Sequence, residues 1–284
     1  MAVNHNDNLQ REMPDISTNK RTSIWMWFFI NSKYQTQLKN CEINSPGMRN
    51  QIAEAIKNNP RIANEIKAFK SLCLLSETAI EWINDDYRQR IYIQKSIIMK
   101  VNYILPTTDN LTNREVSIAT IDTLILTHGA NEKLALVNEI RQSWENTKKT
   151  DKAFEWFDGS DEEQKTQTAW QIIGKKHPEI TSQHLPPKTK NELLITLDFS
   201  TLTHPEKILL IDSIKKRWSQ NKYRAKQNGK NQYNFILSDR AINRLDKLVE
   251  MHEIKRTEVL EILLKMESEN GAYIPKHLNR LGDL

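Results

Sequence analysis

The chain has 284 residues, of which 38% are hydrophobic and 27% charged, and its formal net charge is +5. This length suits one large domain or two modest ones, and the composition is too apolar for a wholly disordered chain. Only 7 residues are glycine, although tight hairpins and phosphate-binding loops depend on glycine. The composition therefore predicts a mainly α fold and argues against a Rossmann or TIM-barrel enzyme.

Cysteine and histidine usage gives no sign of a disulfide framework or a metal site. The two cysteines, Cys41 and Cys73, are too few for either a framework or a four-cysteine zinc site. No pair of histidines has ligand spacing with a nearby Cys or Glu. The longest apolar run, residues 24–30, is far shorter than the roughly 20 residues that span a membrane. We therefore expect a cytoplasmic protein with no membrane span, no metal, no cofactor and no catalytic residues.

The N-terminal half reads as a tail followed by helices. Residues 1–22 are polar and aperiodic, which predicts a flexible tail. Residues 23–150 form a helical domain of unknown role, and Cys73 is expected in its core. Thr112 with Glu115 is typical of a capping box at a helix start. Helices are predicted over 48–58, 61–75, 78–105, 112–129 and 131–147, and an aromatic core cluster at Trp25, Trp27, Phe28 and Phe29.

A helical segment is predicted over residues 151–204. Ser160 with Glu163 and Thr189 with Glu192 indicate two further capping boxes. The pair 204–205 (His-Pro) starts a long helix, because proline is favoured at the first helical position. Residues 205–270 then form a basic helix followed by a separate module, and residues 271–284 a tail.

The positive charge of the chain is concentrated in one stretch. From Ser213 to Ser238 there is no Asp or Glu, and over 205–240 nine basic residues oppose three acidic ones, a balance of +6 against +5 for the whole chain. Basic side chains interleaved with the aromatic Trp218, Tyr223 and Tyr233 are typical of a nucleic-acid contact. A solvated helix face is the alternative interpretation.

A strand and two helices are predicted after the basic stretch. Residues 232–237 alternate, which indicates a short strand, and Ser238 and Thr257 read as N-caps of two amphipathic helices. One strand cannot satisfy its own backbone groups. Pairing of two such strands across a two-fold dimer would satisfy them.

This strand-helix-helix pattern resembles the ribbon-helix-helix DNA-binding proteins of the Arc and MetJ type. The stretch 243–268, NRLDKLVEMHEIKRTEVLEILLKMES, places it nearest to the MatP-like macrodomain Ter organisers. The resemblance covers about residues 205–270 only. It implies a ribbon-helix-helix module with one short strand paired across a homodimer, which inserts the two-stranded ribbon into the major groove of a palindromic double-stranded DNA site. It also implies a nucleoid-associated role in chromosome or plasmid organisation or in transcriptional regulation.

Roles for individual residues follow from the resemblance and from the alternation. Base readout is expected from one face of the strand, at Gln232, Asn234 and Ile236. Phosphate contacts are expected from the basic stretch and the two helix starts, at Lys215, Lys216, Arg217, Lys222, Arg224, Lys226, Lys230, Arg240, Lys255, Arg256, Thr257 and Glu258. The dimer core is expected at Phe235, Leu237, Leu245, Leu248, Val259, Ile262 and Leu263.

Two other functions stay open. The C-terminal module could target a toxin-like effector enzyme to DNA, with the active site in residues 23–150, although no motif supports one. The basic helix could instead coat RNA or the nucleoid without regard to sequence. The N-terminal region could also bind a protein partner.

Overall fold

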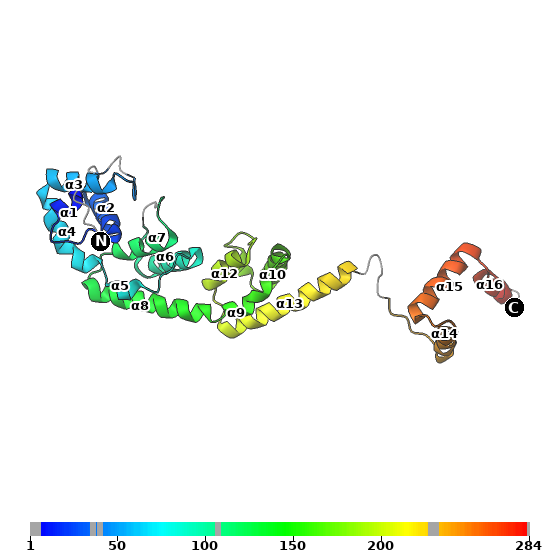
Figure 1. The fold of residues 1–284 in the computed structure, drawn as a ribbon. Helices are drawn as coiled ribbons and strands as arrows, with labels where there is room; N and C mark the ends of the chain where they lie inside the picture. The colour runs from blue at the N-terminus through cyan, green and yellow to red at the C-terminus, as the bar shows by residue number, and fades with distance from the viewer. Residues whose placement is uncertain (1–6, 35–37, 39–41, 106–108, 227–232, 283–284) are drawn as a thin grey trace. The chain divides into compact units, whose positions relative to one another are not determined.

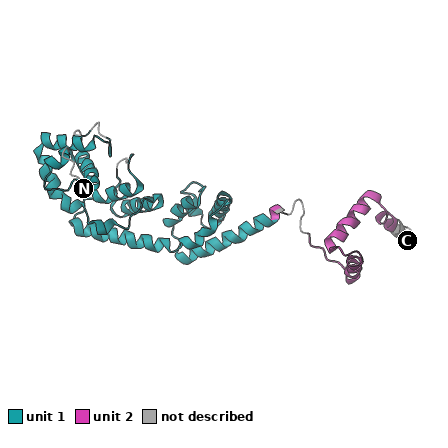
Figure 2. Cartoon of the chain, viewed as in Figure 1, with its two compact units in different colours: residues 1–223 teal, residues 224–284 magenta. Residues whose placement is uncertain are grey.

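The computed structural model describes residues 7–34, 38, 42–105, 109–226 and 233–282, and every regular element in these residues is helical (Figure 1). Contacts divide the chain into two compact units, residues 1–223 and residues 224–284 (Figure 2). The first unit contains three hydrophobic cores in chain order, and the second contains three helices.

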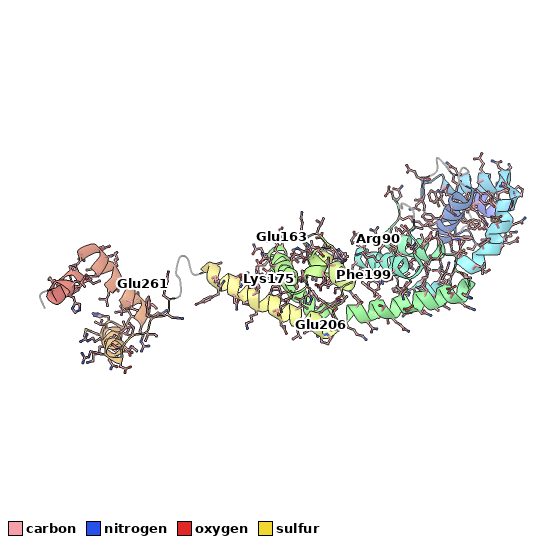
Figure 3. All side chains as sticks on the ribbon, turned by 180° about the vertical axis from the view of Figure 1, so that it is seen from behind. Arg90, Glu163, Lys175, Phe199, Glu206 and Glu261 are labelled. Carbon is pink, nitrogen blue, oxygen red and sulfur yellow. The ribbon has the colours of Figure 1, made fainter. Side chains whose placement is uncertain are left out.

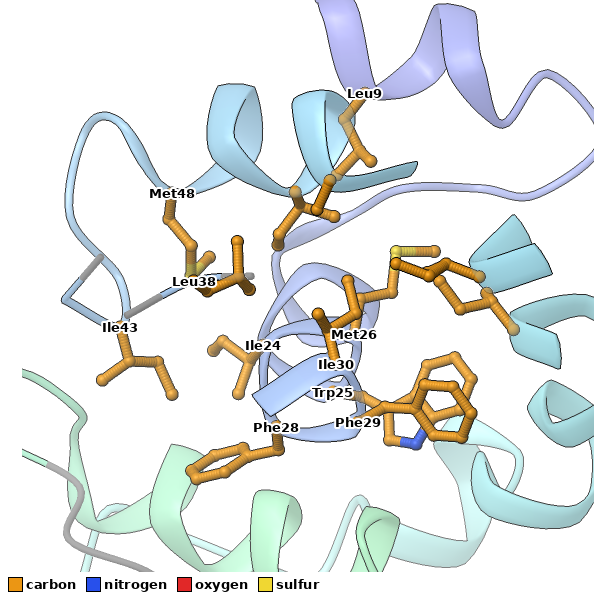
Figure 4. Packing of buried hydrophobic residues seen from close by; sticks show 14 of the residues in the cluster. Leu9, Ile24, Trp25, Met26, Phe28, Phe29, Ile30, Leu38, Ile43 and Met48 are labelled. Atoms are coloured by element: carbon orange, nitrogen blue, oxygen red, sulfur yellow. The ribbon is translucent and has the colours of Figure 1, made fainter. Parts of the chain in front are cut away.

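The first core is built mainly from α1 (Asn8–Glu12), α2 (Lys20–Tyr34), α3 (Met48–Asn58) and α4 (Pro60–Cys73). Val116 and Ala119 of α7 (Asn113–Asp122) also lie in it. Helix α2 lies at its centre, and its aromatic side chains project to more than one side (Figure 4). Trp25, Phe28 and Phe29 are buried, as the aromatic cluster predicted, and Trp27 is partly buried. Leu9 and Met13 are also fully buried, so the prediction of a flexible tail is wrong for the described residues before α2.

The second core is built from α5 (Glu77–Ile80), α6 (Tyr87–Val101), α7 (Asn113–Asp122) and α8 (Gly129–Lys148). The single helix predicted over 78–105 is thus two helices. The Asp86 side chain accepts the backbone N–H groups of Arg88 and Gln89, at 2.7 and 3.2 Å, and this cap starts α6. A left-handed residue, Asn102, ends it.

The third core begins at residue 151 and belongs to the same compact unit as the first two. It comprises α9 (Asp151–Phe154), the 3-10 helix η1 (Glu155–Phe157), α10 (Glu162–Lys176), α11 (Pro178–Thr181), α12 (Lys190–Asp198) and the first half of α13 (His204–Lys226). Helix α13 begins at His204, as predicted. Leu210, Ile211 and Ile214 of α13 are buried in this core, so the boundary predicted at 205 is misplaced.

Buried arginine–aspartate pairs join the three cores. The Arg21 guanidinium on α2 donates twice to Asp122 at the end of α7, at 2.7 and 2.8 Å. The Arg88 guanidinium on α6 donates twice to Asp198 at the end of α12, at 2.7 Å in each case, and also to Asp151 at 2.9 Å. Phe199, next in sequence and labelled in Figure 3, packs its ring 5.2 Å from that of Tyr92 on α6.

The second unit corrects the predicted fold class. Its regular elements are α14 (Asp239–His252), α15 (Arg256–Asn270) and α16 (Ile274–Gly282), and residues 233–238 before them are irregular. No strand or sheet occurs in the described residues, so the predicted ribbon-helix-helix module lacks its ribbon. The alternation correctly indicated that side chains two apart share a face, since the rings of Tyr233 and Phe235 stack at 6.2 Å. A strand also needs a paired neighbour, and the described chain supplies none.

Two further predictions for this unit fail. The helix α16 occupies most of the stretch predicted as a tail after residue 270, with Pro275 accommodated in its first turn. Lys255 rather than Thr257 is the N-cap of α15. Across the described ranges, no helix is long and apolar enough to cross a membrane.

Candidate nucleic-acid interface

Helix α13 lies antiparallel to α10, and two polar contacts fix this arrangement. Lys176 at the end of α10 donates to the Ser213 hydroxyl at 3.0 Å, and Lys222 in the second half of α13 pairs with Asp161 before α10 at 2.6 Å. The acidic residues of α13, Glu206 and Asp212, both precede Ser213. The second half of α13 is therefore free of acidic residues while being held against a folded body.

One side of this second half is cationic. Ser213, Lys216 and Arg217 are three and four positions apart and so lie on one side of the helix. Lys176 reaches this side from α10, through its contact with Ser213. Lys216 is exposed and Arg217 half-buried, and within the described residues neither has a carboxylate partner. We call Lys176, Lys216 and Arg217 the basic face.

The remaining phosphate candidates on α13 differ from these. Lys222 is occupied by Asp161, and its ammonium also lies 5.2 Å from the Trp218 ring. Lys215 is half-buried, with its ammonium 6.0 Å from the Trp156 ring. Arg224 is exposed on the last turns of the helix. The Lys226 side chain and the whole of Lys230 lie outside the described part of the chain.

The candidates near α14 and α15 are scattered rather than gathered. Arg240, Lys255, Thr257 and Glu258 are exposed at the helix starts, and no hydrogen bond or ion pair among the described residues joins Arg240 to the others. Arg256 is paired with Asp246 of α14 at 2.6 Å, which ties the two helices together. The helix starts thus do not form a built phosphate site.

The residues predicted to read bases have no scaffold. Asn234 and Ile236 are exposed on the irregular segment before α14, and Gln232 lies outside the described residues. A base reader must be held in register by its element. With no ribbon to hold them, these residues carry no readout assignment.

The predicted dimer core is only partly assembled within one chain. A groove of about 320 Å³ between α14 and α15 is lined by His252 and five apolar side chains, four of which were predicted for the dimer core: Leu248, Val259, Ile262 and Leu263. Leu245 is half-buried, whereas Phe235 and Leu237 are exposed on residues 233–238. Val259 is the one buried apolar residue among those described in this unit.

Lys133 is the strongest candidate for enzyme chemistry in the N-terminal region. Its side chain is fully buried, and desolvation lowers its pKa to about 8. Its ammonium donates to the carbonyl oxygens of Cys73 and Asp122, at 2.8 and 3.3 Å, which are the last residues of α4 and α7. It therefore caps two helix C-termini from a fully buried position. Burial also raises the pKa of the Cys73 thiol, so that thiol is no nucleophile at neutral pH.

Sequence reasoning missed Lys176, because it belongs to a different helix from the basic stretch. Its signal was the basic pair 175–176 at the end of α10, where lysines complement the helix dipole. The pairing of Lys222 with Asp161, 61 positions away, left no signal in the sequence.

No family model, no curated protein and no solved structure matches this chain. Function therefore has to be inferred from the residues themselves.

Proposed function

We propose that the protein binds double-stranded DNA through the basic face of α10 and α13, and that it does so as a homodimer held together by α14 and α15. The observation that carries the proposal is the acid-free second half of α13, where Lys216 and Arg217 have no carboxylate partner among the described residues. An unpaired cation that reaches solvent keeps its charge available for a phosphate, whereas a paired one such as Lys222 must first give up its carboxylate.

The dimensions of this part of α13 suit a duplex. From Lys215 to Lys226 the helix runs about 18 Å, at 1.5 Å per residue, and the major groove of B-DNA admits an α-helix. Neutralising phosphates releases counterions, so binding of this kind weakens steeply as salt rises. The interaction we propose is directed at the phosphates, and no base-reading side chain is assigned.

The homodimer is inferred from what α14 and α15 leave uncovered. Among its described residues this unit buries one apolar side chain, which is too little for a small unit to be stable alone, and small units of this kind are stabilised by oligomerising. Ile262, Leu263 and Met266 of α15 are each about half exposed, at 48%, 48% and 50%, and burying such side chains against a second copy would contribute to the roughly 800 Å² that each partner gives to a stable interface. A second copy of the chain offers the same surface to the same groove, as two-fold symmetry requires.

The DNA proposal is tested by fluorescence anisotropy with a labelled 20-base-pair duplex, titrated at several salt concentrations. Replacing Lys176, Lys216 and Arg217 with Gln should lower the affinity about tenfold or more and reduce the magnitude of the log–log salt slope by about 2 to 3. The matched control is the triple replacement of three exposed lysines outside α13, at Lys57, Lys152 and Lys188, which removes the same charge.

If the two triple variants lost affinity for the duplex equally, net charge alone would drive binding. That result would overturn the assignment to the basic face. Tighter binding to a single-stranded RNA of the same length than to the duplex would favour an RNA-coating function instead.

A further inference from the structure

Helix α16 of the second unit has an apolar side that the described part of the chain leaves uncovered. Ile274 and Leu278 are four positions apart and so lie on one side of α16, where they are 59% and 60% exposed. In the sequence, Leu281 continues this spacing three positions later. Apolar anchors at the first, fifth and eighth positions are the pattern with which an amphipathic helix enters an apolar groove. Helix α16 therefore has the pattern of a docking helix.

The carboxylate of Glu267 on α15 fixes the turn that leads into α16. It accepts the backbone N–H of Tyr273 at 3.0 Å and that of Ile274 at 2.7 Å, which satisfies donors at the start of α16. Gly271 ends α15 in the left-handed conformation, with φ 55°. In the arrangement that these bonds hold, none of the described residues that line the groove between α14 and α15 belongs to α16. The groove of the same chain is therefore left open.

That groove has the size and lining that α16 requires. Its volume is about 320 Å³, and apart from His252 its lining is apolar. A dry cavity of about 150 Å³ is enough to hold benzene, so the groove has room for two aliphatic side chains. Ile262 and Leu263 in the lining are each 48% exposed. Covering the groove with an apolar helix side would remove them from water.

The charges of α15 and α16 are opposite. Helix α15 carries four acidic residues and two basic ones, whereas α16 carries Lys276 and Arg280 and no acidic residue. Glu258 and Glu269 are exposed and lie four and seven positions from Ile262, on the same side of α15 as this groove-lining residue. Opposite charges favour one partner and disfavour an acidic one. The chain thus contains both halves of a complementary pair.

We propose that in the homodimer α16 of each copy lies in the groove between α14 and α15 of the other, with Ile274 and Leu278 buried in it. The inference rests on the proposed homodimer and specifies which part of the second copy enters the groove. Two-fold symmetry makes the exchange reciprocal, so both grooves and both α16 helices are covered at once. The turn held by Glu267 stays intact.

Aspartate substitutions on α16 test the contact in the full-length chain. Ile274→Asp combined with Leu278→Asp should raise the dissociation constant of the dimer at least tenfold in sedimentation velocity, because two carboxylates would enter an apolar groove. The matched control is Met99→Asp combined with Leu185→Asp, which replaces two exposed apolar side chains of the first unit and adds the same charge. The control should leave the dissociation constant within about twofold.

Methyl NMR detects the contact in the natural sequence, without any substitution. Copies that carry ¹³C-methyl groups only at isoleucine are mixed with copies labelled only at leucine. Every nuclear Overhauser cross-peak between an isoleucine and a leucine methyl group then joins two different copies. We expect cross-peaks from Ile262 to Leu278 and from Ile274 to Leu263.

The outcomes distinguish this inference from the homodimer on which it rests. A natural chain that is monomeric at micromolar concentration would overturn both. A natural dimer for which the α16 variant associates as tightly as its control, or whose cross-peaks join Ile262 to Leu263 and not to Leu278, would overturn only the exchange of α16. Cross-peaks between Ile262 and Leu278 that require both labels on one copy would place α16 in its own groove, against the proposal.

Discussion

Individual buried charges do structural work in the first unit. Asp122 accepts two hydrogen bonds from Arg21, and its own carbonyl oxygen accepts one from Lys133. Each of these charges is compensated by groups from a different helix. Removing one partner of such a set leaves the other buried and unpaired, which costs more than the pair contributes. These residues are therefore read as structural rather than catalytic.

Lys133→Met should change how stability depends on pH. The pKa of Lys133 is about 8 in the folded chain and about 10.4 when unfolded. Between these values the unfolded chain binds more protons, so the free energy of unfolding of the natural chain rises with pH, by at most roughly 3 kcal/mol from this group. Below about pH 8 the ammonium is charged in both states, so this group adds nothing to the pH dependence of the free energy of unfolding.

The measurement is urea unfolding at pH 7 to 10.5, followed by circular dichroism. The free energy of unfolding of the natural chain, minus that of Lys133→Met, should increase as the pH rises. An exposed control, Lys149→Met, should track the natural chain. Parallel curves for Lys133→Met and the natural chain would show that the folded-state pKa is not lowered.

Single helices follow local rules, with informative exceptions. The capping box of Thr112 and Glu115 is present in both directions, at 3.2 and 3.0 Å. At Thr189 only half of the predicted box forms, since the Glu192 carboxylate accepts from Lys188 instead. The box predicted at Ser160 is absent because α10 begins one residue later than that pattern requires, with Asp161 as its N-cap. Cap motifs thus locate helix starts to within a residue or two.

Arg88→Ala tests how helices from different cores are joined. It should destabilise the chain by about 3–5 kcal/mol, because Asp198 is 3% exposed and would lose both hydrogen bonds from the guanidinium while it stays buried. Adding Asp198→Asn should restore part of the loss, since the buried group becomes neutral.

The control for this prediction is Arg141→Ala, which breaks an exposed pair four residues apart on α8 and should cost about 0.5 kcal/mol or less. Urea midpoints measure all three variants. A similar loss from Arg88→Ala and Arg141→Ala would contradict the role given to the buried pair.

At the scale of the whole molecule, the two units differ in how much they bury. The first has three cores joined by ion pairs, whereas the second leaves large apolar side chains exposed, including Ile262 and Leu263, each at 48%. A folded unit with so little buried surface needs a partner. The proposed homodimer would provide it.

Ile262→Asp combined with Leu263→Asp should convert a dimer to a monomer. The two side chains line the groove, and two carboxylates there would lose their hydration on association, with His252 as the one titratable side chain in the lining. Sedimentation velocity of the full-length chain measures the mass. Leu264→Asp is the matched control, because Leu264 lies on the same helix, is 70% exposed and does not line the groove. A natural chain that is monomeric at micromolar concentration would refute the dimer.

Much of the helical structure could be read from the sequence. Glycine scarcity indicated a helical chain, His204 marked the start of α13, and Thr112 marked the start of α7. The absence of acidic residues after Ser213 was also visible in the sequence alone. These features depend on hydrogen bonds between residues four apart and on the chemistry of the next turn, so a short window of sequence contains their causes.

Only the tertiary structure decided which charges are free and which segments pair. Arg88 meets Asp198 across 110 positions, Arg21 meets Asp122 across 101, and Lys222 meets Asp161 across 61. The alternating residues 233–237 remained irregular because a strand depends on a neighbour that a local pattern cannot supply. The basic face arises in the same way, since it is assembled from two helices separated in the sequence that hydrophobic packing brings together.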